Sequence, residues 1–316
     1  MSGILFEHNK LLREFSNYKI GGVADYFCAP KTVEEIVEAL RDWGNRGEIF
    51  ILGGGTNLLI SDSGFRGLVI KPELSTITIE GTNVRVGAGA FMSDILIATI
   101  DAGLSGLEWA GGLPGTVGGA ARGNAGAFGG ETKDCALEVR SVMIDAENPQ
   151  RKIRKNDECN FGYRNSIFKE NDCKEIITEV ILQLVPGDCA QIAKAIEEKK
   201  EYRRTRHPIE YPNIGSIFKN VALETAPKVV QQQFAHVIKK DPFPVIPTAC
   251  LLAEANLKGV VHGGAMISPK HPNFIVNMGS ATAYDVQALI ALIKKTILEK
   301  FGVTLEEEVI EVGFRD

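Results

Sequence analysis

Hydrophobic side chains recur at helical spacing in several stretches of the chain. The clearest stretch is Thr282–Phe301, which Gly302 ends and whose apolar stripe comprises Val286, Leu289, Ile290, Ile293 and Ile297. A second helix is predicted to start at Thr32, because Thr32 and Glu35 form a capping-box pattern ahead of another apolar stripe. Two further helices are predicted, one capped by Ser93 and ending at Gly103, and one from Asp188 to Arg206 that His207-Pro208 ends.

Short β-prone segments separated by glycine turns fill most of the first half of the chain. Residues 77–86, interrupted at Gly81-Thr82-Asn83, predict a hairpin, and residues 175–185 predict a long strand. Other short strands are predicted at 50–52, 68–71 and 274–277, with a closing strand at 303–312. The pattern predicts a glycine-rich, β-containing first half and a smaller α+β second half, with a boundary between residues 186 and 208.

The composition is that of an ordinary globular protein, and the net charge argues against one class of binding partner. The chain has 316 residues, of which 44% are hydrophobic and 24% charged. Its net charge of -5 argues against nonspecific nucleic-acid binding, which needs a strongly basic face. Residues 1–10 lack the apolar core of a signal peptide, and no uncharged apolar stretch approaches the ~20 residues of a membrane span.

Cysteine usage indicates a reducing compartment. Cysteines are dispersed without a CxxC pair, and the five histidines do not cluster with them. A secreted disulfide scaffold would be short and cysteine-dense. We therefore expect a cytoplasmic protein with no metal site and with reduced thiols at Cys28, Cys135, Cys159, Cys173, Cys189 and Cys250.

Glycine is concentrated in two clusters. Residues 103–130 contain eleven glycines in 28 residues, where average usage of ~7% predicts about two. Such a run is predicted not to form a stable helix, because each interior glycine costs ~1 kcal/mol relative to alanine. A second cluster, Gly53-Gly54-Gly55, follows an apolar segment. The clusters are either tight turns or backbone that approaches a ligand closely, and two long clusters in one half favour a ligand.

Familiar nucleotide motifs do not explain these clusters. The chain has no GxGxxG, so a dinucleotide-binding Rossmann turn is not supported, and it has no GK[ST], which excludes a P-loop. Residue type alone does not single out a catalytic group either. By type alone Arg164 is a surface arginine, Ser216 is a turn residue after Gly215, and Glu308 belongs to a solvated charge run.

Six motifs nevertheless occur in a specific order along almost the whole chain. They are NYKIGGVAD at 17–25, ILGGGTNLL at 51–59, GLEWAGGLPGTVGGA at 106–120 followed by NAGA at 124–127, FGYRNS at 161–166, GSIFKN at 215–220 and LEEEV at 305–309. This ordered series resembles the UDP-N-acetylenolpyruvoylglucosamine reductase family.

The resemblance implies an α+β fold with a two-part FAD-binding domain of the vanillyl-alcohol-oxidase type. That domain would span residues 1–187, with its two subdomains split near residue 72. A smaller α+β substrate-binding domain would span 188–302, and a C-terminal strand at 303–316 would carry a catalytic glutamate.

The resemblance also implies non-covalent FAD, with NADPH as the reductant. The residues expected to contact FAD are Gly53, Gly54, Gly55, Thr56, Asn57, Leu58, Ala110, Gly111, Pro114, Gly115, Thr116, Gly119, Asn124, Gly126 and Arg206. Those expected to bind the substrate are Tyr163, Lys219 and Asn220.

The reaction implied by the resemblance is the reduction of an enolpyruvyl ether on UDP-N-acetylglucosamine to the lactyl ether. It serves peptidoglycan precursor synthesis. Arg164 would stabilise charge on the carboxylate, because its planar, permanently charged fork matches that group. Ser216 matches the family's proton donor, and Glu308 matches its third catalytic residue. The expected partners are the sugar nucleotide and NADPH, with no nucleic acid, membrane or obligate protein partner.

Three positions depart from the family pattern. Arg122-Gly123 stands where the family often has an aromatic residue and methionine, and Glu307 stands where it often has proline. The chain also resembles the shorter subgroup, which lacks an inserted segment that closes a tyrosine over the substrate.

Two other function classes are weighed against the reductase. A flavin-binding module that has lost catalysis would be damaged at Arg164, Ser216 or Glu308, and all three are present. A related FAD-dependent oxidase of another small alcohol or sugar would need no sugar-nucleotide site, and the intact stretch at 215–220 argues against it.

Overall fold

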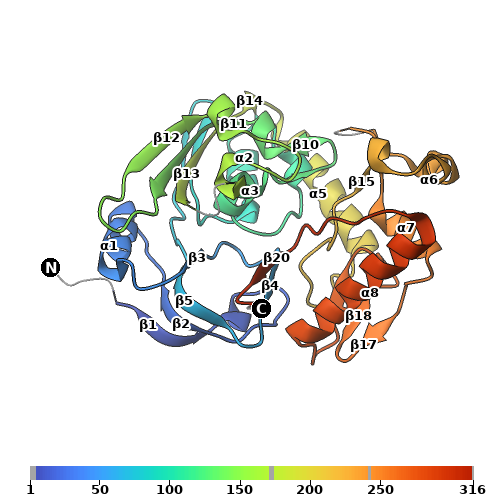
Figure 1. Ribbon diagram of the computed structural model, residues 1–316. Helices are drawn as coiled ribbons and strands as arrows, with labels where there is room; N and C mark the ends of the chain where they lie inside the picture. Colours follow the sequence, from blue (N-terminus) through green and yellow to red (C-terminus); the bar gives the residue numbers. More distant parts are fainter. Residues whose placement is uncertain (1–4, 171–173, 241–242, 315–316) are drawn as a thin grey trace. The chain divides into compact units, whose positions relative to one another are not determined.

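The structure is a computed structural model that describes residues 5–170, 174–240 and 243–314 (Figure 1). The chain forms two compact units, each assembled from non-consecutive segments. Unit 1 combines Met1–Lys10, Ala24–Gly54 and Arg66–Arg203, and unit 2 combines Leu11–Val23, Gly55–Phe65 and Arg204–Asp316. The division into consecutive segments 1–187, 188–302 and 303–316 stays a prediction.

A five-stranded antiparallel sheet forms the centre of unit 1. Its order is β12 (Arg151–Lys155), β11 (Ala136–Met143), β13 (Glu175–Gln183), β7 (Asn83–Gly87) and β6 (Ile77–Glu80). The pairing of β6 with β7 confirms the predicted hairpin. Strand β13 places Ile176 and Ile177 in hydrophobic clusters on opposite faces, which explains its almost continuous apolar run.

Helices cover both faces of this sheet. On one face, α2 (Met92–Asp101) and α3 (Val117–Gly123) pack in one cluster with Val139 and Val180 (Figure 1). On the other, α1 (Val33–Trp43) packs against Val142 and Ile176. Thr32 caps α1 by accepting the Glu35 N–H at 3.1 Å, so the predicted helix start is confirmed.

A second sheet has the order β1 (Glu7–Leu11), β2 (Val23–Cys28), β5 (Phe65–Ile70) and β3 (Ile49–Ile51). The remaining short pairs are β8 (Leu104–Ser105) with β14 (Val185–Pro186), β9 (Gly126–Ala127) with β10 (Gly130–Glu131), and β15 (Val221–Ala222) with β16 (Val245–Ile246). Further α-helices of the described residues are α4 (Ile167–Glu170), α5 (Cys189–Arg206), α6 (Lys228–Gln233) and α7 (Thr248–Glu254). Of these, α6 and α7 contribute Val230, Leu251 and Leu252 to the core of unit 2.

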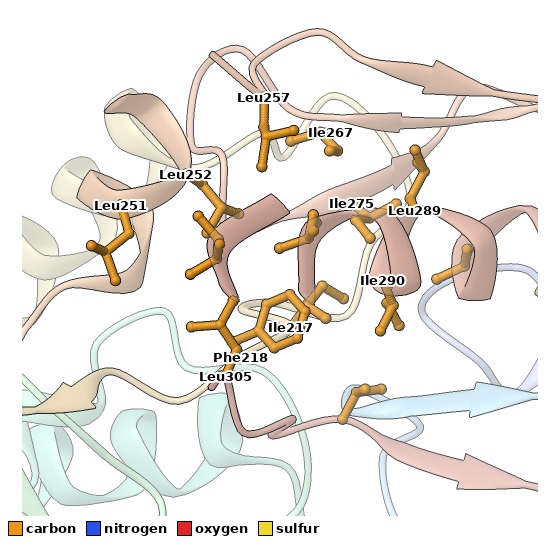
Figure 2. Close-up of a cluster of buried hydrophobic side chains, with 14 of the residues drawn as sticks. Ile217, Phe218, Leu251, Leu252, Leu257, Ile267, Ile275, Leu289, Ile290 and Leu305 are labelled. Atoms are coloured by element: carbon orange, nitrogen blue, oxygen red, sulfur yellow. The ribbon is translucent and has the colours of Figure 1, made fainter. Parts of the chain in front are cut away.

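Helix α8 (Ala283–Phe301) organises the core of unit 2. All five residues of its predicted stripe are buried, and they pack with a sheet of β17 (Val261–His262), β18 (Ala265–Ile267) and β19 (Ile275–Asn277). Thr282 and Asp285 form a complete capping box, and Gly302 ends the helix at φ 63°, as predicted. Figure 2 shows Ile217 and Phe218 beside Leu305 within the same cluster.

Three sequence predictions about the elements are wrong. Phe91, rather than Ser93, is the N-cap of α2, because the extended Phe91 forms a bridge with Thr116. The glycine run does contain a helix, α3, which Thr116 caps and whose buried Val117 and Ala121 pack in the core. Tertiary packing of this kind offsets low propensity: a Cβ on Gly118 would lie 2.8 Å from the Ala88 Cβ.

The closing strand is the third correction. Only β20 (Ile310–Val312) is a strand, and it pairs in parallel with β4 (Leu58–Ile60). Leu305 and Val309 are drawn into the core around α8 instead, and the backbone between them pairs with residues 217–219. The alternation of apolar residues therefore reflects burial in a core rather than one continuous strand.

The five cysteines that the structure describes form no disulfide. Cys28, Cys135, Cys159, Cys189 and Cys250 are free thiols, and Cys173 lies outside the described residues. Burial raises the pKa of Cys28 to about 12, so that thiol stays protonated. Over the described ranges, no group of acidic, histidine and cysteine side chains could hold a metal ion, and no helix is long and apolar enough to cross a membrane.

Candidate active site

The two glycine clusters touch each other in unit 1. A Cβ on Gly54 would lie 2.7 Å from the Cα of Gly115, and a Cβ on Gly53 would lie 3.2 Å from Oγ1 of Thr116. Gly115 itself has φ 106°, a conformation that favours glycine. The close approach of these two backbones requires glycine at Gly54.

Several backbone N–H groups are left available along this contact. Among the residues that the structure describes, none accepts a hydrogen bond from the N–H of Gly53, Gly54, Gly115 or Thr116. A Cβ on the nearby Gly119 would meet only Oγ1 of Thr116, at 3.6 Å, so packing does not require glycine there. Unpaired N–H groups beside open glycine backbone suit the phosphate oxygens of a dinucleotide.

The same turn continues into unit 2, where Gly55 and Asn57 contact other residues of the protein. Gly55 has φ 65°, and a Cβ there would lie 1.8 Å from the carbonyl oxygen of Phe15, so no other residue fits. The side-chain amide of Asn57 donates to the carbonyl oxygen of Glu308 at 2.9 Å, and the backbone carbonyl of Asn57 accepts the Ile310 N–H at 3.1 Å. Asn57 therefore fixes the backbone next to the predicted catalytic glutamate.

Arg164 is held in an unusual backbone conformation in unit 1. Its φ is 55°, in the left-handed region that non-glycine residues seldom adopt, and such strain clusters at functional sites. One guanidinium nitrogen donates to the carbonyl oxygen of Gly126 at 2.9 Å, and the group lies 5.4 Å from the ring centre of Tyr163. These contacts orient the guanidinium beside the predicted flavin-contact segment.

Asn124 supports this arrangement from inside the protein. It is completely buried, and its amide nitrogen donates to Glu131 at 3.1 Å and to the carbonyl oxygen of Gly162 at 2.9 Å. Its amide oxygen accepts the Lys133 N–H at 3.0 Å. The side chain of Asn124 thus anchors the loop before Arg164.

Arg203 is a residue that the sequence analysis missed. It lies on α5, donates to the carbonyl oxygen of Gly111 at 2.9 Å and stacks 5.3 Å from the ring centre of Phe128. Burial, and then the positive charge of Arg164, lower the pKa of Arg203 to about 10. Its Nη2 is buried, without a hydrogen-bond partner in the part of the chain that the structure describes. An anionic ligand would relieve this repulsion and satisfy that nitrogen.

Helical spacing is the signal that could have found Arg203. Ile192 and Ile196 form the buried face of α5, and continuing the same spacing leads to Lys199 and Arg203. Arg206, the predicted flavin contact, is exposed at the last residue of the helix.

In unit 2, Ser216 and Glu308 lie on two paired backbone segments. The Glu308 N–H donates to the carbonyl oxygen of Ile217 at 2.8 Å, and the Lys219 N–H donates to that of Glu306 at 2.9 Å. These bonds flank the bridge between Phe218 and Glu307. The structure therefore brings together two of the three predicted catalytic residues through their backbones.

Glu307 and Glu308 have different surroundings. Glu307 forms an ion pair with Lys294 of α8 at 2.9 Å. Because side chains alternate along extended backbone, Glu308 is expected to point to the other side. This difference distinguishes the two glutamates, which the sequence pattern could not.

The other predicted site residues of unit 2 surround the same segment. Gly215 has φ 85°, and the Ser216 hydroxyl forms no hydrogen bond with any residue that the structure describes. Lys219 forms an ion pair with Glu306, and the amide oxygen of Asn220 accepts the Thr248 N–H at 3.2 Å.

Packing explains some of the glycines predicted to contact FAD. A Cβ on Gly111 would lie 2.7 Å from the carbonyl oxygen of Ile196, and one on Gly126 would lie 2.7 Å from Cγ of Glu131. Ala110 is fully buried, whereas Pro114 is exposed. These positions shape the segment that presents Gly115 and Thr116.

Comparison with known proteins places the chain in one family. Residues 24–147 match the FAD binding domain model, and residues 207–312 match that of the UDP-N-acetylenolpyruvoylglucosamine reductase C-terminal domain. The reductase of Geobacillus kaustophilus is 38% identical over 93% of this chain and 89% of its own length. The chain belongs to the UDP-N-acetylenolpyruvoylglucosamine reductase family.

Other members of the reductase family agree over the same length. The reductase of Lactobacillus delbrueckii subsp. bulgaricus is 39% identical over 98% of this chain and 96% of its own. The crystal structure of the Thermus caldophilus reductase is similar at a TM-score of 0.77, with 30% identity over 98% of this chain and 99% of its own. These matches confirm the predicted fold class and the resemblance on which the site residues were chosen.

Replacing Gly54 with alanine is expected to weaken FAD binding roughly tenfold or more. The new Cβ would lie 2.7 Å from the Gly115 Cα and push apart the two backbones, and overpacking of this kind costs about 1–3 kcal/mol. Flavin fluorescence titration of the apoprotein measures the change. Gly47→Ala is the matched control, since its Cβ would meet only Cζ2 of Trp43, at 3.8 Å. Equal FAD affinities for the two variants would contradict the account.

Proposed function

We propose that this chain reduces the enolpyruvyl ether of UDP-N-acetylglucosamine to the lactyl ether, using NADPH and non-covalent FAD. It is an FAD-dependent oxidoreductase of peptidoglycan precursor synthesis. Membership of the reductase family along nearly the whole chain carries the proposal. An oxidase of a small alcohol or sugar is not favoured, because residues 207–312 match the C-terminal domain of the reductase.

The residues of the glycine-rich contact fit the cofactor. Available N–H groups at Gly53, Gly54, Gly115 and Thr116 would bind its phosphate oxygens, and the open backbone at Gly119 would admit it closely. Bound FAD would take a hydride from NADPH and supply it to the terminal vinyl carbon of the substrate. Gly55, Thr56, Asn57, Leu58, Ala110, Gly111, Pro114, Asn124, Gly126 and Arg206 complete the proposed FAD-contact set.

Arg164 has the properties needed to bind the substrate carboxylate. Its left-handed backbone and its bond to Gly126 fix the guanidinium, which presents several donors in one plane. Negative charge grows on that carboxylate as hydride adds to the terminal vinyl carbon, so a fixed cation stabilises the transition state more than the substrate. Tyr163, Lys219 and Asn220 would bind the rest of the anionic sugar nucleotide.

Ser216 would deliver the proton that completes the reduction. The proton goes to the carbon that bears the carboxylate, so that one hydride and one proton together saturate the double bond. A serine hydroxyl is a weak acid, but an enolate-like carbon is basic enough to take its proton. Glu308, on the paired segment, would stabilise the enolic form by hydrogen bonding.

The cellular setting follows from this role. We propose the bacterial cytoplasm as the location, with the sugar nucleotide and NADPH as small-molecule partners and no obligate protein, nucleic-acid or membrane partner. The net charge of -5 supports the exclusion of nonspecific nucleic-acid binding.

The function is tested by the stoichiometry of the reaction. Purified protein loaded with FAD should oxidise one NADPH for each enolpyruvyl sugar nucleotide consumed, and mass spectrometry should find a product with two more hydrogens. UDP-N-acetylglucosamine without the enolpyruvyl group is the control and should not be reduced. NADPH consumption that yields hydrogen peroxide at the same rate with either compound would contradict the proposal.

A further inference from the structure

Asn273 forms an unusual set of hydrogen bonds with the backbone next to Ser216. Its amide oxygen accepts the Phe218 N–H at 3.1 Å, and its amide nitrogen donates to the Phe218 carbonyl oxygen at 2.8 Å. Its backbone carbonyl accepts the Ile217 N–H at 2.8 Å. Asn273 is 3% exposed, so these bonds form away from water.

The segment after Ser216 is thereby held on both edges. Residues 306–308 pair with one edge through two backbone bonds, and Asn273 takes the place of a third strand on the other. Its side-chain amide offers the donor and acceptor that a neighbouring peptide unit would offer. Phe218 and Ile217 are each 1% exposed, and Figure 2 shows both within the buried cluster.

The backbone before Ser216 is held by a separate set of contacts. Gly215 has φ 85°, and a Cβ there would meet nothing within 4 Å. Its N–H donates to the side chain of Asn213 at 3.1 Å, and the side chain of Asn17 donates to the carbonyl oxygen of Asn213 at 3.1 Å. Ile214 is 3% exposed. The Ser216 backbone is therefore fixed from both sides, and Asn273 acts on the Ile217 side.

We propose that Asn273 is a positioning residue that fixes Ser216 and its paired neighbour Glu308 for protonation of the substrate. This role rests on the proposed function. Asn273 would touch neither substrate nor cofactor. It would act by holding Ile217 and Phe218, the two residues that connect Ser216 to the segment carrying Glu308.

The first test compares Asn273→Ala with Asn277→Ala. Asn277 is a matched control: it lies nearby in the same unit, is 4% exposed and forms three hydrogen bonds, but with Tyr18, Gly279 and Ala281. Both variants should lower the urea midpoint. Only Asn273→Ala should lower turnover, by about 10²-fold at unchanged KM, the effect of a misplaced group about 1 Å from its productive position. Its solvent deuterium isotope effect should rise, because proton transfer becomes slower.

A double-mutant cycle separates positioning from general destabilisation. If Asn273 acts through Ser216, adding Asn273→Ala to Ser216→Ala should lower turnover little further. Asn273→Asp is a variant whose side chain has nearly the same shape as that of asparagine. Its ionised carboxylate has no donor for the Phe218 carbonyl, whereas its protonated form offers one donor and one acceptor. The turnover of this variant relative to the parent should therefore rise as pH falls.

The outcomes distinguish the two proposals. Equal losses of turnover in Asn273→Ala and Asn277→Ala, or effects of Asn273→Ala and Ser216→Ala that multiply, would overturn the role of Asn273 alone. A parent protein that binds FAD but reduces no enolpyruvyl sugar nucleotide would overturn the proposed function itself.

Discussion

Replacing Ser216 with alanine is expected to slow reduction of the enolpyruvyl substrate by about 10²–10⁴-fold while NADPH still bleaches the bound flavin at the parent rate. The range is that of a general acid removed from a proton-transfer step. Ser216 lies in unit 2, on the segment paired with Glu308, so the substitution should leave the glycine-rich contact of unit 1 unchanged. Stopped-flow absorbance measures the two half-reactions separately.

Ser280→Ala is the control for this variant. Ser280 also follows a glycine with positive φ, since Gly279 has φ 117°, and it is exposed in the same unit. It therefore tests the alternative that Ser216 is only a turn residue. The account is contradicted if Ser216→Ala consumes the substrate as fast as Ser280→Ala does.

Replacing Arg154 with leucine is expected to lower the free energy of unfolding by about 3 kcal/mol at neutral pH. Arg154 donates to Glu175 at 2.5 Å, and Ser141 donates to the same carboxylate at 2.7 Å. The Glu175 side chain is 2% exposed, so the variant would leave a buried charge that has lost its cationic partner. Removing one partner of a buried pair typically costs about 3–5 kcal/mol, and the partial exposure of Arg154 favours the lower end.

The loss of unfolding free energy in Arg154→Leu should become smaller as the pH falls. Burial alone would raise the pKa of Glu175, but hydrogen bonds from Arg154 and Ser141 outweigh it and hold the pKa below its usual value. In the parent, the pair thus stabilises the fold above the unfolded pKa of ~4.3, and that contribution is lost as pH falls through the folded value. In the variant, burial dominates and protonation relieves the penalty.

Urea unfolding at several pH values measures this difference. Arg151→Ala is the control on the same strand, because Arg151 pairs with Glu34 at the surface and its loss should leave the midpoint nearly unchanged. A deficit for Arg154→Leu that is small at neutral pH, or that grows in acid, would contradict the account.

Local patterns predicted those elements whose local and tertiary preferences agree. The α8 stripe, its capping box and Gly302 all favour the same helix, and the helix forms as predicted. The prediction of a strand at residues 303–309 was wrong because the alternation of Leu305 and Val309 is compatible with burial in a core as well as with a strand. Helix α3 was not predicted because its stability comes from packing against Ala88, which no local pattern encodes.

The residues of the candidate site that belong to sequence motifs could be predicted. Those whose role depends on tertiary contacts could not. Ser216 and Glu308 were chosen from separate motifs, and the pairing of their backbones depends on a contact across 91 positions of sequence. Asn273 carries no motif, because its role arises from two hydrogen bonds to Phe218, 55 residues away. Arg203 was hidden in a helix rich in charged residues, whose faces only helical spacing can separate.

The most direct test of the account follows the absorbance of the bound flavin in one anaerobic cuvette. Purified protein should show an oxidised flavin spectrum that one equivalent of NADPH bleaches. Adding the enolpyruvyl ether of UDP-N-acetylglucosamine should then restore the spectrum, and adding UDP-N-acetylglucosamine should not. A flavin that stays bleached with the enolpyruvyl substrate present, and recovers only when oxygen is admitted, would contradict the assignment as a reductase of this sugar nucleotide.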